Sequence, residues 1–244
     1  MSGHSHARTV RHQKEASALQ RGATFSKMIK ILTIAVKESG PNPETNTKLK
    51  MAIERAKGFN MPKDNIERAI KNAAGGADVQ NLEEVSFEAY GPGGIAVIIE
   101  GVTDNKNRTL NLIKQALNQG GGKLAQEGSV RWMFDRKGII IVDTNLQTDP
   151  SKNKESIEMT AIESGAEDIR QSDNILEIYT KPEEVQIIKS TLETKGIKIE
   201  SGNIEWIAKD EITLEGSDKE SAQRLFDSLS DNEDVQDTYS NLKE

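Results

Sequence analysis

The sequence predicts an α+β protein, in which an N-terminal three-helix domain precedes two α+β (ferredoxin-like) domains, one inserted in the other. Apolar residues recur at helical spacing at first, and strand-like apolar runs that alternate with helices follow them. The strand, helix and strand that follow residue 209 lack a first half, and the strand, strand and helix before residue 128 lack a second half. Only together do the two blocks make one complete layer of sheet and helices. The predicted domains are therefore a basic three-helix domain, a split domain and an inserted ferredoxin-like domain, covering 1–78, 79–128 plus 209–244, and 129–208.

The N-terminal domain is expected to contain three amphipathic helices. The first covers residues 24–39, and the second follows an N-cap at Asn46 or Thr47. The third covers residues 61–76, with a proline where a first helical turn tolerates it. Each carries an apolar stripe at i, i+3, i+4 spacing, made by Phe25, Met28, Leu32, Val36, Leu49, Ile53, Ile66 and Ile70.

The split domain begins with strand, turn and strand over residues 85–103, followed by a helix over 107–121. The GPGG turn at 91–94 is interpreted as a hairpin loop with positive φ, because no Lys-Ser or Lys-Thr pair follows it as in a phosphate-binding loop. After residue 209 the pattern predicts a strand, a helix and a strand, at 211–216, 218–230 and 235–241.

The inserted domain is expected to alternate strands and helices. Its strands are predicted at 129–134, 137–143, 175–180 and 197–208, and its helices at 154–164 and 182–195. This is the element content of a ferredoxin-like fold.

Charge is distributed unevenly along the chain. The 244 residues carry a net charge of −7, yet residues 1–74 hold 14 Lys and Arg against 6 Asp and Glu, a net of +8. Residues 75–244 therefore carry a net of −15. A basic segment joined to an acidic remainder indicates a polyanionic partner such as nucleic acid. The alternative is a solvated, Lys-rich helical surface.

Several function classes are disfavoured. The chain has no cysteine, and its three histidines are His4, His6 and His12, so the residues of a catalytic triad are not at hand. We expect no enzyme, no cofactor and no metal site, with the histidines serving phosphate contact. No apolar run of about 18 residues and no secretory signal are apparent, so we expect a cytoplasmic protein without a membrane span.

The stretch TDNKNRT at 103–109 precedes a predicted helix. Asn105 or Asn107 can cap this helix, and Lys106 and Arg108 can add charge to an anion site at its N-terminus. A phosphate contact and a plain capped helix start are both open at this point.

Several motifs resemble the YebC/PmpR family over nearly the whole chain. They are MSGHS, QRGATFSKMIKILTIAVKESG, NMPKDNIERAI, FEAYGPGGIAVIIEGVTDNKNRT, GSVRWMF and DVQDTYSNL. The resemblance implies three domains, one inserted in another, and no enzymatic activity. It implies DNA binding, as in bacterial members classed as transcriptional regulators, or RNA and ribosome binding, as in members that assist translation, including that of proline-rich stretches. The chain departs from the family at His6-Ala7, where a Lys-Trp pair is usual.

We therefore expect a nucleic-acid-binding regulator of gene expression, with DNA binding as the first hypothesis and a ribosome- or RNA-associated translation factor as the alternative. A protein-interaction scaffold is the third possibility. The residues expected to contact phosphates are His4, Arg8, Arg11, His12, Lys14, Arg21, Lys27, Lys30, Lys48, Lys63, Arg68 and Lys71.

Overall fold

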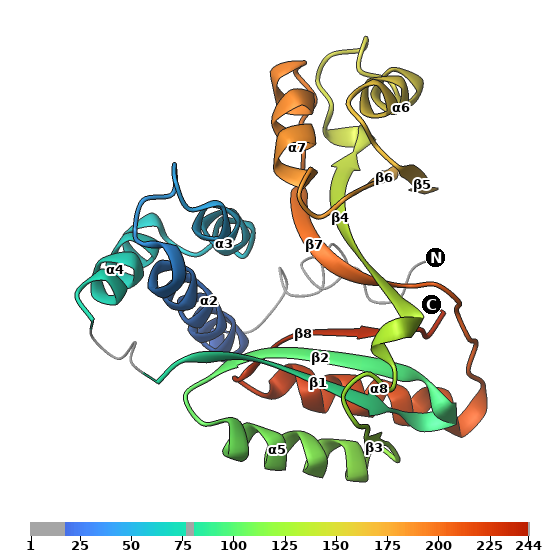
Figure 1. Cartoon of the computed structure of the whole chain (residues 1–244). Coiled ribbons are helices and arrows are strands. Elements are labelled where there is room, and N and C mark those ends of the chain that lie inside the picture. Colours follow the sequence, from blue (N-terminus) through green and yellow to red (C-terminus); the bar gives the residue numbers. More distant parts are fainter. Residues whose placement is uncertain (1–17, 77–80, 244) are drawn as a thin grey trace. The chain divides into compact units, whose positions relative to one another are not determined.

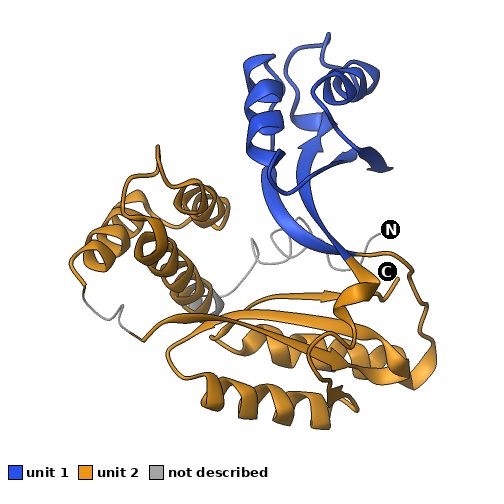
Figure 2. Ribbon diagram, viewed as in Figure 1, with its two compact units in different colours: residues 1, 135–207 blue, residues 2–134, 208–244 orange. Residues whose placement is uncertain are grey.

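The computed structural model describes residues 18–76 and 81–243. The chain forms two compact units, Asp135–Ile207 and a second unit that combines Ser2–Phe134 with Ala208–Glu244 (Figure 2). The second unit contains the three N-terminal helices and a four-stranded sheet, and the first contains another four-stranded sheet.

Three helices open the described chain: α2 (Ala18–Ser39), α3 (Thr47–Gly58) and α4 (Lys63–Ala74) (Figure 1). Their apolar stripes form a shared core, which includes Met28, Leu32, Leu49 and Ile66. Asn46 is the N-cap of α3, as predicted, because its side-chain oxygen accepts the Leu49 N–H at 2.9 Å. Its amide group also donates to the carbonyl oxygens of Ala35 and Gly40, which joins the end of α2 to the start of α3.

The sheet of the second unit has the order β3-β1-β2-β8. Its strands are β1 (Glu83–Tyr90), β2 (Ala96–Thr103), β3 (Lys123–Leu124) and β8 (Val235–Ser240). Two helices, α5 (Lys106–Gln119) and α8 (Gly216–Asp231), cover one face of it (Figure 1). The core between sheet and helices is mostly aliphatic, with Ile99, Leu117 and Leu225 fully buried and Phe87 and Phe226 beside them. Strand β8 lies beside β2 although more than 130 residues separate them in the chain.

The turn between β1 and β2 is the predicted hairpin loop with positive φ. It forms a 3-10 turn, η1 (Pro92–Gly94), in which Gly93 has φ 63° and Gly94 has φ 81°. A Cβ atom at Gly93 would also collide with the side chain of Leu214. The residue at this position must therefore lack a side chain for two separate reasons.

The other unit has a ferredoxin-like topology. The chain passes through β4 (Phe134–Asp143), α6 (Lys154–Glu163), β5 (Asp168–Ser172), β6 (Ile175–Thr180), α7 (Val185–Thr194) and β7 (Ser201–Ala208). The sheet order is β5-β6-β4-β7, and the pairs β4–β6 and β5–β6 are antiparallel. This β-α-β-β-α-β succession confirms the predicted α+β class and the ferredoxin-like content.

The structure corrects two predicted strands and adds one that the sequence did not predict. Residues 129–133 are a loop with a 3-10 turn, η2 (Arg131–Met133), because their backbone N–H groups turn to the carboxylate of Glu88. Residues 211–216 contribute only an isolated bridge, Ile212 with Leu242. Strand β5 was not predicted, because its sequence DIRQS is too polar to give a strand signal. A further 3-10 turn, η3 (Thr144–Leu146), follows β4.

Candidate nucleic-acid interface

The predicted phosphate contacts fall into three groups. His4, Arg8, Arg11, His12 and Lys14 lie outside the described residues, and Arg21 lies in the first turn of α2. The remaining six side chains are described, and they separate into an outward-facing set on α4 and a set that contacts other parts of the chain.

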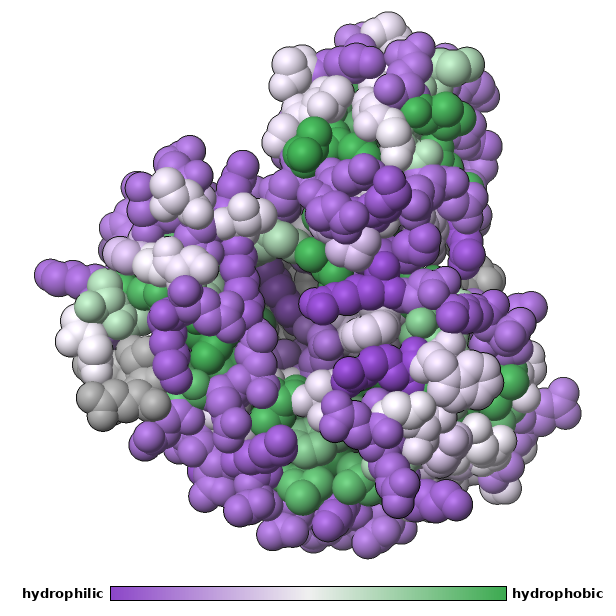
Figure 3. All heavy atoms as spheres, in the orientation of Figure 1, coloured by the Kyte–Doolittle hydropathy of each residue, from purple (hydrophilic) through white to green (hydrophobic). Residues whose placement is uncertain are grey.

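Helix α4 carries the outward-facing set. Lys63, Arg68 and Lys71 are all exposed, and the Lys63 side chain retains 81% of its accessible surface. Their contacts are local: Lys63 lies 3.5 Å from Glu67 on the next turn, and Arg68 donates to the Asn65 side chain. Exposed pairs of this kind contribute little energy, so these cations can exchange their partners for phosphate. Hydrophilic side chains cover much of the surface over these helices on the face that Figure 3 shows.

Helix α3 adds two exposed cations that the sequence analysis did not select. Lys50 and Lys57 are seven residues apart and are both exposed. Their spacing of two helical turns, on the side away from the apolar stripe, is the signal that could have identified them.

Lys48 is used inside the chain. Its ammonium group lies 2.7 Å from both Glu38 and Glu84, so it links the end of α2 to β1. Burial acts to lower the pKa of Lys48, but the hydrogen bonds to the two carboxylates raise it above its ordinary value. Lys48 therefore holds two carboxylates of the same chain, and the phosphate contact that we expected would have to compete with them.

Lys27 and Lys30 are also used inside the chain. Both extend from α2 to the turn between α8 and β8: Lys27 Nζ donates to the Ser230 carbonyl oxygen at 2.5 Å, and Lys30 Nζ lies 2.6 Å from Asp234 Oδ1. Burial lowers the pKa of Lys27 to about 8, against the attraction of the nearby Asp237 carboxylate. Both lysines, which we expected to contact phosphates, are half-buried and donate to oxygens of the same chain.

Arg55 of α3 joins the same set of contacts, and it was missed by the sequence analysis. Its two terminal nitrogens contact the two oxygens of Asp237 at 2.8 Å and 2.7 Å, which is a bidentate pair. A longer bond reaches the Gln236 carbonyl oxygen at 3.4 Å. We refer to Lys27, Lys30 and Arg55, together with the segment 230–237 that they contact, as the charged joint.

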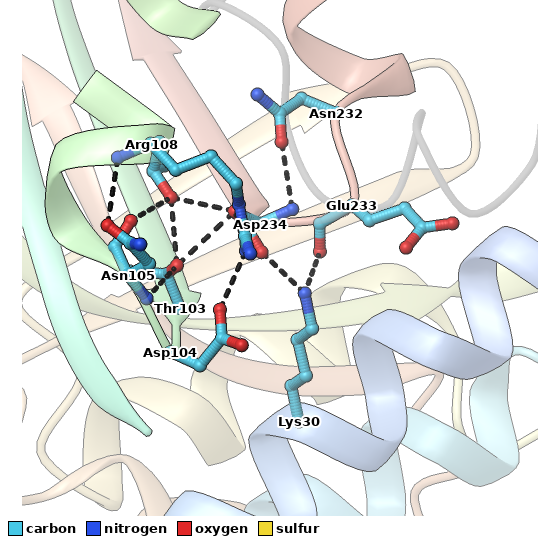
Figure 4. Close-up of polar contacts among 9 residues, drawn as sticks. Lys30, Thr103, Asp104, Asn105, Arg108, Asn232, Glu233 and Asp234 are labelled. Carbon is cyan, nitrogen blue, oxygen red and sulfur yellow. Dashed lines mark hydrogen bonds and ion pairs between the residues drawn. The ribbon is translucent and has the colours of Figure 1, made fainter. Parts of the chain in front are cut away.

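Asp234 lies at the centre of a larger polar network (Figure 4). Besides Lys30, it accepts hydrogen bonds from Arg108 at 2.9 Å and from the Thr109 hydroxyl at 2.7 Å. Burial acts to raise the pKa of Asp234, but the hydrogen bonds from Lys30, Thr109 and Arg108 lower it to about 2. The carboxylate therefore ties α2, the start of α5 and the start of β8 together.

The TDNKNRT stretch takes part in this network. Asn105 is the N-cap of α5 and accepts the Arg108 N–H at 3.0 Å. The guanidinium group of Arg108 contacts Asp104 and Asp234, so its charge is used within the chain (Figure 4). The stretch is a capped helix start, and Lys106 is exposed beside it.

A second buried carboxylate holds the loop after β3. Glu88 accepts the backbone N–H groups of Gly128, Val130 and Arg131 at 2.8, 2.7 and 3.0 Å. Although burial acts to raise the pKa of Glu88, these hydrogen bonds lower it. The loop presents Trp132, which is 68% exposed while its indole nitrogen donates to the Ser129 carbonyl oxygen.

Two further features bear on the kind of site. Among residues 18–76 and 81–243, no helix combines the length and apolar character that a membrane crossing requires. Within the same residues, no three His, Cys, Asp or Glu side chains are grouped so that they could hold a metal ion. The described candidate site thus consists of cations that contact carboxylates, carbonyl oxygens or solvent.

Models of one family match almost the whole chain. Residues 5–76 match the TACO1/YebC protein N-terminal domain, and residues 82–242 match the TACO1/YebC second and third domain. Similar proteins from Caldanaerobacter subterraneus subsp. tengcongensis and Desulforamulus reducens are 45% and 41% identical. The matches span 100% of this chain in both cases, and 98% and 100% of the respective relatives. Both relatives bear the name "Probable transcriptional regulatory protein".

A solved structure agrees with these matches. The crystal structure of a conserved hypothetical protein from Aquifex aeolicus superposes with a TM-score of 0.82 at 38% identity. The similarity covers 93% of this chain and 91% of the other. Sequence and fold therefore agree along the full length, and the chain belongs to the TACO1/YebC family.

Proposed function

We propose that this protein is a nucleic-acid-binding regulator of gene expression, and that it binds DNA through its basic N-terminal helices. The observation that carries the proposal is the full-length similarity to relatives named as transcriptional regulatory proteins. The proposed protein works in the cytoplasm, without a cofactor and without an enzymatic reaction.

Phosphate contacts of the proposed interface are made by Lys63, Arg68 and Lys71, because these cations are exposed and hold only local partners. The basic residues of the N-terminal arm, His4, Arg8, Arg11, His12, Lys14 and Arg21, remain part of the proposal. Such contacts supply affinity and position the protein without reading bases. The acidic remainder of the chain repels nucleic acid and so confines binding to the basic helices.

The test is a titration of a labelled DNA duplex of about 24 base pairs by fluorescence anisotropy, at salt concentrations from about 50 to about 200 mM. A triple variant, Lys63→Glu, Arg68→Glu and Lys71→Glu, reverses the α4 cations. A matched control, Lys114→Glu, Lys198→Glu and Lys219→Glu, makes the same charge change at exposed lysines elsewhere. We expect the α4 variant to bind at least about tenfold more weakly than the control and to lose about three units of log–log salt slope.

Equal losses in both variants would show that net charge alone acts and that α4 is not the contact face. No binding of duplex by the unaltered protein would contradict direct DNA binding. The same titration with RNA of matching sequence addresses the alternative. A clear preference for RNA would move the proposed regulation from transcription to translation and would make the ribosome the partner to examine.

A further inference from the structure

We propose that Lys27, Lys30 and Arg55 form a second phosphate-binding site, which the segment 230–237 of the same chain covers, and that a nucleic-acid backbone competes with this segment for the three cations. The inference rests on the proposed function, because it concerns the same polyanionic ligand. It accounts for cations that lie on the basic helices and yet donate to oxygens of the same chain.

The contacts of the charged joint are those of an anion site. Each cation donates to an oxygen of the segment: Lys27 to the Ser230 carbonyl, Lys30 to the Asp234 carboxylate, and Arg55 to both oxygens of Asp237. A guanidinium group makes the same two-pronged contact with phosphate oxygens. The segment thus presents oxygens at residues 230, 234 and 237 to the three cations, as a chain of phosphate groups would.

The segment carries the charge needed for this role. Four of its eight residues are acidic, and they are Asp231, Glu233, Asp234 and Asp237. Because the segment is covalently attached, it reaches a high effective concentration at the three cations. Free nucleic acid displaces it only by making several phosphate contacts at once, which favours long polyanions over single small anions.

Two polar groups of the charged joint lack full compensation by hydrogen bonds or opposite charge. Lys27 is half-buried and donates to a carbonyl oxygen, and the pKa of its ammonium group is lowered to about 8, so the charged form lacks full compensation. Both polar atoms of the Gln236 amide are buried and have no hydrogen-bond partner within residues 18–76 and 81–243. Phosphate oxygens placed here would supply negative charge to Lys27, and an opened joint would let the amide reach water.

Opening the joint leaves neither of the two paired carboxylates isolated. Asp234 keeps Arg108 and Thr109 when Lys30 departs, so it remains paired on its own side. Asp237 loses Arg55, but its side chain is already 21% exposed and can take up water. The two carboxylates therefore remain paired or hydrated when the three cations leave the charged joint.

The first experiment compares two substitutions that remove one negative charge each. Asp237→Asn weakens the contact to Arg55, and Glu233→Gln removes an exposed carboxylate from the same segment and serves as the control. Both proteins are titrated with the duplex of about 24 base pairs used above. We expect Asp237→Asn to bind about tenfold more tightly than the control and with a salt slope steeper by two to three units, about one unit for each cation released.

A second set of variants tests whether Lys27 and Arg55 cause the tighter binding and steeper salt slope expected of Asp237→Asn. Lys27→Gln and Arg55→Gln, added to Asp237→Asn, should return the salt slope to that of the control. The same two substitutions in the unaltered background should change binding by less than about threefold, because the segment covers these cations there. If Asp237→Asn proves too unstable to measure, Asp237→Ser in the full chain takes its place.

A spectroscopic measurement separates this inference from the proposed function. In the Asp237→Asn protein, the pKa of Lys27 is followed by NMR of its side chain, with and without duplex. A rise in that pKa on binding supports phosphate contact at the joint. Binding through α4 with an unchanged Lys27 signal and an unchanged slope would overturn this inference and leave the proposed function intact. Absence of DNA and RNA binding in every variant would overturn the proposed function itself.

Discussion

Lys30 of α2 and Asp234 of the turn before β8 are 204 residues apart in the chain, and their charged groups lie 2.6 Å apart. The Asp234 side chain keeps only 4% of its accessible surface, so this pair is largely removed from water. The contact connects the three-helix part to the sheet that β8 completes (Figure 4).

Removal of the Asp234 side chain should strongly destabilise this unit. The Asp234→Ala change leaves Lys30, Arg108 and the Thr109 hydroxyl without their common acceptor. Breaking a buried charge pair by deleting one partner costs about 3–5 kcal/mol. Denaturant unfolding followed by circular dichroism measures the loss, with Glu233→Ala as the control at the neighbouring exposed position. A loss below about 1 kcal/mol would mean that the network is weak.

Asp234 should also make the stability depend on acid. Its pKa in the folded chain is about 2, below its ordinary value of 3.8, so the folded state favours the ionised carboxylate. The contribution, about 2 kcal/mol, is fully present above pH 4 and is lost as the pH falls from about 4 to about 2. Unfolding free energies measured across this range should fall less in Asp234→Asn than in the unaltered protein. Parallel pH profiles would contradict the low pKa.

Lys27 should act in the opposite pH range. Its folded pKa of about 8 lies below its ordinary value of 10.5, so the folded state disfavours the charged amine. Between about pH 8 and pH 10.5 the unfolded chain binds the additional proton, and stability should therefore rise with pH by up to about 3 kcal/mol. Lys27→Met should abolish this rise in denaturant unfolding experiments. An equal rise in the variant would assign it to another group.

Local signals in the sequence predict these helices and narrow each cap to two residues. The apolar stripes predict α3 and α4, and the structure selects Asn46 from Asn46 and Thr47, and Asn105 from Asn105 and Asn107. The sequence does not predict strand β5, because DIRQS is polar at most of its positions and forms a strand only by pairing with the neighbouring β6. Strand pairing of this kind depends on tertiary context more than helix formation does.

The fate of the basic residues was beyond sequence reasoning for a different reason. Lys63 and Lys27 are both lysines of amphipathic helices. Lys63 is exposed, whereas Lys27 donates to the Ser230 carbonyl oxygen. The difference arises from a segment about 200 residues further along the chain, which no local pattern reveals. One signal was present: Lys27 lies four and seven residues before Ile31 and Ile34, so it shares a helix face with two apolar residues, of which Ile34 is buried.

The hairpin turn allows the two roles of Gly93 to be separated. Gly93→Ala places a side chain at positive φ and against Leu214, whereas Gly94→Ala has positive φ but open space around the new Cβ atom. Positive φ alone costs an alanine about 1–2 kcal/mol. We expect Gly94→Ala to lose about that much stability and Gly93→Ala clearly more, measured by thermal unfolding. Equal losses would show that Leu214 moves aside without cost.

Glu88 should control the position of the exposed Trp132. In Glu88→Gln the side chain keeps its size but loses the charge that strengthens three bonds from backbone N–H groups. Hydrogen bonds to a charged group contribute about 1.5–3 kcal/mol each, so the loop 128–132 should detach locally before the unit unfolds. Trp206 is the other tryptophan, so a Trp206→Phe background isolates the emission of Trp132. We expect lower anisotropy and faster quenching of Trp132 by acrylamide in the Glu88→Gln protein. Glu84→Gln, on the same strand but exposed, is the control, and identical quenching in both variants would show that the loop holds Trp132 without the buried carboxylate.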